Sequence, residues 1–80
     1  MYKVILSAHG NPYRYQDPNM EVAKRKVASA ESVEECQRIV RDYIDDNVLG
    51  EGNWTGGDVF LDDERIGCIA YNGTFFRKGL

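Results

Sequence analysis

One amphipathic helix is the feature of this sequence that most constrains its fold. After Ser32, apolar residues recur at three- and four-residue spacing and share a stripe about 100° wide, as a helix on a sheet surface needs. Ser32-Val-Glu-Glu35 matches a capping box, in which the serine side chain accepts from the backbone amide three residues later. Gly50 is the expected left-handed terminator. The residues of the stripe are Val33, Cys36, Val40, Tyr43 and Ile44, with Val48 continuing the spacing.

The remaining apolar segments predict a sheet. The loop over residues 9–20 holds both prolines and a Gly-Asn pair, which are loop signals. The basic run Lys24-Arg25-Lys26 is typical of a sheet edge. We expect one α+β domain over residues 1–80, an antiparallel sheet of four to five strands with one helix packed on one face, in the order β-β-α-β-β-β. The expected strands are Tyr2–Ser7, Glu21–Ser29, Asp58–Leu61, Ile66–Tyr71 and Thr74–Arg77.

Two turns determine which side chains share a face of the sheet. Asn72-Gly73 predicts a two-residue type I′ turn, and residues 62–65 predict a four-residue turn. Because directly paired residues share a face, these turns predict a helix-covered face of Val59, Leu61, Ile66, Cys68, Ala70 and Phe75. The other face then carries Phe60, Ile69, Tyr71 and Phe76. Such a patch is either an interaction surface, including that of a homodimer, or is covered by the 9–20 loop with Tyr13 and Tyr15.

Composition narrows the class of protein. A chain of 80 residues hides only about 60% of its unfolded surface, so a deep pocket is not expected. No apolar run approaches the ~20 residues of a membrane span, and the first residues resemble a strand more than a secretory signal. Cys36 and Cys68 have no CxxC spacing, so two reduced, core-facing thiols are expected in a cytoplasmic protein.

No motif for catalysis or cofactor binding is present. The sequence lacks GxSxG, GxxxxGK[ST] and GxGxxG, and it has one histidine, His9. His9 with Cys36 and Cys68 lacks a fourth zinc ligand, and the acidic triplet 62–64 is better explained as a solvated turn. We therefore expect no enzyme activity, no cofactor and no metal, with a small enzyme or toxin built around His9 as a lesser alternative.

The charge pattern favours a basic protein partner. The net charge is −3, and residues 31–64 hold eleven acidic residues against two arginines, whereas both ends of the chain are basic. Asp45 and Asp46 fall in the last helical turn, where the dipole disfavours negative charge by ~0.3–1 kcal/mol each. A solubilising helix face is the alternative explanation. The expected partner-binding carboxylates are Glu34, Glu35, Asp42, Asp45 and Asp46.

Direct nucleic-acid binding is the main alternative function. Tyr13-Arg14-Tyr15 interleaves aromatic and basic groups, and Lys24, Arg25 and Lys26 supply charge, as in a small nucleic-acid-binding regulator. The acidic helix and a sequence pI near 5.0 oppose it, because such proteins usually carry a broad basic face.

Two stretches carry a resemblance to known proteins. Residues 46–60 (DNVLGEGNWTGGDVF) and 66–73 (IGCIAYNG) look like small proteins of alphaproteobacteria and their prophages. The layout of strands, helix and closing meander is similar to small anti-CRISPR proteins that act on type I surveillance complexes, in particular type I-C. The resemblance implies a phage or mobile-element protein that inhibits without chemistry, docking on the basic, DNA-facing side of the complex and blocking recruitment of target DNA. Trp54, beside the helix end, would then be an aromatic anchor or a plug of the core.

Overall fold

The computed structural model describes residues 1–79 as an α+β fold with one helix on a five-stranded antiparallel sheet. The predicted fold class and the order β-β-α-β-β-β are confirmed. The strand order across the sheet is β2-β1-β3-β4-β5, so the basic strand is an edge strand, as predicted. No helix of the described residues is long and apolar enough to cross a membrane. The elements are β1 (Tyr2–His9), β2 (Glu21–Ala30), α1 (Val33–Asp46), β3 (Asp58–Leu61), β4 (Glu64–Ile69) and β5 (Phe75–Arg77), with short 3-10 helices at Pro12–Arg14 and Glu51–Asn53.

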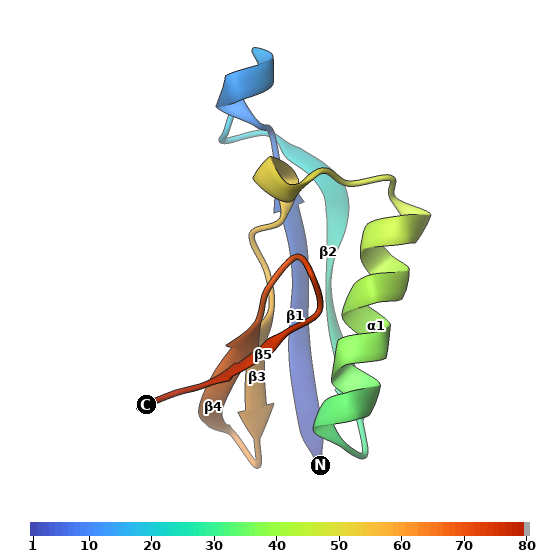
Figure 1. Ribbon diagram of the computed structural model, residues 1–80, viewed down its shortest axis with the longest axis vertical. Coiled ribbons are helices and arrows are strands. Elements are labelled where there is room, and N and C mark those ends of the chain that lie inside the picture. Colours follow the sequence, from blue (N-terminus) through green and yellow to red (C-terminus); the bar gives the residue numbers. More distant parts are fainter. Residues whose placement is uncertain (80) are drawn as a thin grey trace.

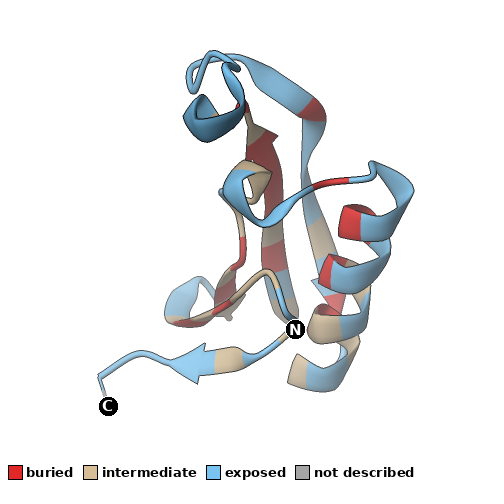
Figure 2. Cartoon of the chain, turned by 45° about the horizontal axis from the view of Figure 1, so that its top comes forward, coloured by how far each residue is buried: buried red, intermediate tan, exposed pale blue. Residues whose placement is uncertain are grey.

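The core lies between α1 and the β1–β2 side of the sheet. Figure 1 shows the helix beside these two strands, and Figure 2 shows buried residues on β1 and on the facing side of α1. Small side chains on β2, Ala28 and Ala30, let the helix approach closely. The predicted helix-covered face lies on the last three strands, whereas the small residues against which the helix packs lie on β2. The largest fully buried side chains are Val4, Cys36, Val40, Val59 and Ile69.

The helix begins as predicted and ends earlier. Ser32 Oγ accepts from the Glu35 backbone amide at 3.1 Å, and the Glu35 carboxylate accepts from the Glu31 amide at 3.1 Å. The expected terminator, Gly50, is not left-handed. Instead Val48 adopts φ +52°, and its amide donates to the Asp45 carbonyl at 3.2 Å.

The predicted turn between β3 and β4 is wrong. Asp62 and Asp63 both have positive φ (49° and 72°) and form a two-residue turn, so Leu61 pairs with Glu64. A bulge in β4 then brings Val59 opposite Gly67. The prediction of a four-residue turn over residues 62–65 was wrong because aspartate tolerates the left-handed region, which a two-residue turn requires.

The predicted turn between β4 and β5 is also wrong, by one residue. The Gly73 amide donates to the Ala70 carbonyl at 2.9 Å, and the Ala70 amide donates to the Thr74 carbonyl at 2.9 Å. The loop therefore has three residues, with Gly73 at φ +90°, which is the type I turn plus bulge that a three-residue hairpin favours. Ile69 consequently pairs with Phe75 and Cys68 pairs with Phe76.

These registers exchange the two faces of β4 only, because Val59 and Phe75 lie on the helix side and Phe60 and Phe76 on the other side, as predicted. Ile69 is 1% exposed and packs in the core with Phe75, on the helix side. Cys68, expected in the core, is half-buried on the opposite side, and both cysteines are free. We call that opposite side the open face; its apolar residues are Ile5, Val27, Phe60, Cys68 and Phe76.

Candidate functional site: the acidic face of the helix

The outer face of α1 carries four exposed carboxylates. The buried stripe of Cys36, Val40, Tyr43 and Ile44 fixes the inward side of the helix, so the acidic residues project into solvent. The exposed acidic residues are Glu34, Asp42, Asp45 and Asp46, and the helix also exposes Arg38 and Arg41.

Glu35 differs from these four because it serves the helix start. It is half-buried, and its carboxylate accepts from the Glu31 amide. Burial, and to a smaller extent the Glu35 charge, raises the pKa of the neighbouring Cys36 thiol. The Glu35 carboxylate thus already has a protein donor, the amide of the residue before the N-cap Ser32.

The exposed helix carboxylates lack cationic partners within the described part of the chain. The two ion pairs among residues 1–79 join the amino terminus to Asp62 at 3.0 Å and Arg65 to Asp58 at 3.1 Å. The last turn of α1 has no basic residue to offset the dipole at Asp45 and Asp46, and the nearest arginine of the helix, Arg41, forms no ion pair among residues 1–79. These carboxylates are available to a partner and gain little from their own fold.

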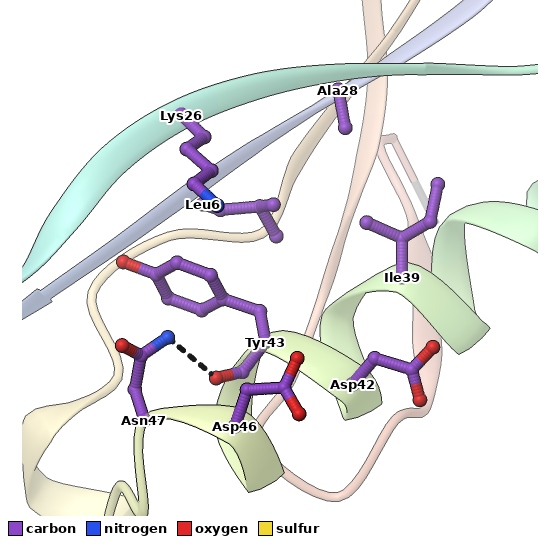
Figure 3. Close-up of a pocket in the computed structure, with 8 residues that line it drawn as sticks. All are labelled: Leu6, Lys26, Ala28, Ile39, Asp42, Tyr43, Asp46 and Asn47. Carbon is purple, nitrogen blue, oxygen red and sulfur yellow. Dashed lines mark hydrogen bonds between the residues drawn. The ribbon is translucent and has the colours of Figure 1, made fainter.

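A groove of about 450 Å³ runs between α1 and β2, next to the acidic face. Figure 3 shows Asp42 and Asp46 on the helix side of the groove and Lys26 on the strand side. The Tyr43 hydroxyl donates to the Lys24 carbonyl at 2.8 Å and ties the helix to the edge strand. Burial, followed by the charge of Glu21, raises the pKa of Tyr43. The groove is lined by Leu6, Lys26, Ala28, Ile39, Asp42, Tyr43, Asp46 and Asn47.

Trp54 lies against the core and not on the acidic face. Its Nε1 donates to the Ile69 carbonyl at 3.0 Å, and its half-buried ring meets Tyr43 edge-on. Of the two roles that the sequence left open for Trp54, the structure therefore provides the contacts of a core plug.

The predicted second face is divided between two environments. Phe60 and Phe76 lie on the open face, and Phe76 is 55% exposed. Ile69 lies in the core, and the Tyr71 hydroxyl donates to the Leu49 carbonyl at 3.2 Å. The 9–20 loop does not cover the open face, because it forms the far tip of the β1–β2 hairpin.

That hairpin tip presents two exposed tyrosines on either side of Arg14. Tyr13 is 93% exposed and Tyr15 is fully exposed. Asn11 Oδ1 accepts from the Tyr13 amide at 3.0 Å, and Gln16 Oε1 accepts from the Asn11 amide at 2.8 Å. Lys24, Arg25 and Lys26 are exposed on β2, so the tip and the basic strand lie on one continuous hairpin.

A polar cluster that the sequence did not predict joins His9 to Ser7 through Thr55. Thr55 Oγ1 lies 2.7 Å from His9 Nδ1 and 3.1 Å from Ser7 Oγ. The partners are 46 and 48 residues apart, and no sequence signal connects them. His9, Cys36 and Cys68 do not meet, since residues 1–79 contain no group of three His, Cys, Asp or Glu side chains arranged for a metal.

Comparisons with protein-family models, with curated proteins and with solved structures found no match for this chain.

Proposed function

We propose that this protein is a non-enzymatic inhibitor of a type I CRISPR–Cas surveillance complex, acting in the bacterial cytoplasm. The observation that carries the proposal is the row of exposed carboxylates on α1 that have no cationic partner among residues 1–79. The inhibitor would bind the basic, DNA-facing surface of the complex through that helix face and block recruitment of target DNA. Such a mechanism needs no cofactor and breaks no covalent bond.

The electrostatics of α1 support this proposal. A surveillance complex must hold nucleic acid in a channel of lysine and arginine, and carboxylates can pair with the same groups. Asp45 and Asp46 disfavour the isolated helix, but a nearby cation of a partner would offset the dipole. Charge complementarity also speeds encounter, and this effect weakens with salt because charges are screened over about 10 Å at 0.1 M.

The choice of a CRISPR–Cas complex as the basic partner comes from the resemblance to small anti-CRISPR proteins. The confirmed order β-β-α-β-β-β agrees with the layout on which the resemblance is based. A fold does not by itself determine a function, so the test must be a binding experiment. The helix also lies on the outside of the molecule, where a partner can reach it.

The test is a competition experiment with a purified type I-C surveillance complex. The wild-type protein should bind the complex and prevent loading of a labelled target duplex. Asp45→Lys with Asp46→Lys should weaken binding, most strongly at low salt. A matched control, Glu51→Lys with Glu64→Lys, makes the same change in net charge on exposed acids outside α1 and should keep affinity. Equal weakening by both double variants would contradict a specific role of the helix.

A second candidate function, nucleic-acid binding, is favoured by the hairpin tip. Tyr13 and Tyr15 are free to stack on bases, and Arg14 lies between them. Labelled single-stranded DNA should be bound in the absence of any Cas protein if this function is right, and Tyr13→Ala with Tyr15→Ala should abolish that binding. If the inhibitor proposal is right, the bare DNA stays unbound and the acidic helix alone controls affinity.

A further inference from the structure

We infer that the groove between α1 and β2 receives one arginine side chain of the basic partner. This inference rests on the proposed function, because it names the group that the acidic helix face recognises. The guanidinium would lie between Asp42 and Asp46, and the aliphatic stem would lie on the apolar floor of the groove.

The helix wall of the groove supplies two carboxylates in a suitable arrangement. Asp42 and Asp46 are four residues apart on α1, so they are neighbours on one helix face. Both are exposed, and neither takes part in an ion pair within residues 1–79. A guanidinium offers five donors in a planar fork, which suits two carboxylates on successive turns better than a single ammonium does.

The floor of the groove suits the stem of the same side chain. Leu6 is buried beneath the groove, and Ala28 and Ile39 are half-buried along it. Arginine covers apolar surface with its methylene groups while its charged head stays near water. The buried Tyr43 side chain also lines the groove and adds to this apolar floor.

The other polar groups of the groove are already engaged or carry positive charge. The Tyr43 hydroxyl donates to the Lys24 carbonyl, and the Asn47 amide donates to the Tyr43 carbonyl at 2.9 Å, the dashed line in Figure 3. Lys26 pairs with Leu6 in the sheet, so its side chain is on the helix-facing side of β2. Its ammonium competes with an incoming cation, whereas it would attract an anion.

This competition gives opposite expectations for the two kinds of ligand. Lys26→Met removes the charge and keeps an apolar stem. It should tighten binding of an arginine probe and should weaken binding of an anionic probe. If Lys26 is the only cation that the groove holds, neither probe should bind.

The experiment is an NMR titration of the isotope-labelled full chain with Nα-acetyl-arginine amide at millimolar concentrations. Amide shifts should move at Ala28, Ile39, Asp42 and Asp46. Asp42→Asn with Asp46→Asn should lower the affinity for the arginine probe by about three- to tenfold, as expected for the loss of two exposed ion pairs. Lys26→Met should raise the affinity for the arginine probe. Nα-acetyl-norleucine amide, which has the stem without the charge, should produce no such shifts.

Three results would overturn the inference: no shifts at the groove, equal shifts with the norleucine probe, or weaker arginine binding by Lys26→Met. A preserved amide spectrum in each variant shows that the fold is intact. The failure of this inference is separable from that of the proposed function. Asp42→Asn removes one carboxylate of the groove, and Glu34→Gln removes one exposed carboxylate of α1 outside it. Asp42→Asn should weaken binding to the surveillance complex more than Glu34→Gln does if the groove takes an arginine. Equal effects of these two variants, together with loss in Asp45→Lys/Asp46→Lys, would reject the groove and keep the acidic helix.

Discussion

The indole of Trp54 meets the ring of Tyr43 edge-on, with centroids 6.0 Å apart and planes inclined by 61°. This contact joins the loop after the helix to the helix itself. The indole nitrogen also donates to the Ile69 carbonyl on β4, so one side chain connects three parts of the core. We therefore expect Trp54 to contribute to stability.

Trp54→Phe should lower the free energy of unfolding by about 1–3 kcal/mol, because the Ile69 carbonyl loses its donor. Urea unfolding followed by circular dichroism measures the change in the free energy of unfolding. Tryptophan fluorescence cannot be used, because the variant removes the only tryptophan. Affinity for the surveillance complex should not change once folding is controlled. A stable variant with weak binding would instead identify Trp54 as an interface anchor.

Val48→Gly should stabilise the protein. Val48 is β-branched, 89% exposed and held at φ +52°, a conformation that costs L residues about 1–2 kcal/mol. Glycine removes that cost but loses more entropy on folding, so the expected net gain is about 0.5–1 kcal/mol. Thermal melting measures the gain. Val48→Ala is the matched control, because it keeps a Cβ and should recover little.

The elements of this fold were predictable where the signal is local. Ser32 and Glu35 are three residues apart, and the apolar stripe after them determines both the helix and its outward face. The acidic face was therefore accessible from the sequence.

The face of β4 that packs in the core was not predictable from the same evidence. Gly73 takes the left-handed conformation in a two- or a three-residue turn, and the difference of one residue moves Ile69 from one face to the other. The burial of Ile69 against the rest of the core decides between the turns. The groove and the Ser7–Thr55–His9 cluster likewise depend on residues brought together from distant parts of the chain.

Alkaline pH should destabilise the protein through two buried groups. Burial is the main cause that raises the pKa of Cys36 above its ordinary 9.0 and that of Tyr43 above its ordinary 10.0. The unfolded chain thus loses these protons first, and stability that is complete below pH 9.0 falls as pH rises through the folded-state pKa values. Melting temperatures from pH 8 upward measure the fall. Cys36→Ala should make the melting temperature fall less steeply with pH. An unchanged dependence of the melting temperature on pH would show that Cys36 does not contribute.

Self-association through the open face remains a prediction, and the structure changes the residue that tests it. Tyr71→Glu would break the hydrogen bond to Leu49, so loss of fold would confuse the result. Phe76 is 55% exposed and pairs with Cys68 on the open face. If a dimer forms there, sedimentation should show the wild type as a dimer and Phe76→Glu as a monomer. A wild type that sediments as a monomer at high concentration contradicts the prediction.

Stability and binding should move in opposite directions when the end of α1 is changed. Asp45→Lys with Asp46→Lys removes two charges that the dipole disfavours and adds two that it favours, so melting should show a gain of about 1 kcal/mol. The same variant should lose affinity for the surveillance complex, and the loss should shrink as salt rises. A face that only keeps the protein soluble predicts the gain in stability without the loss of affinity. Unchanged affinity at low salt would therefore eliminate the acidic helix as the binding surface and leave the hairpin tip and the open face as the places to look.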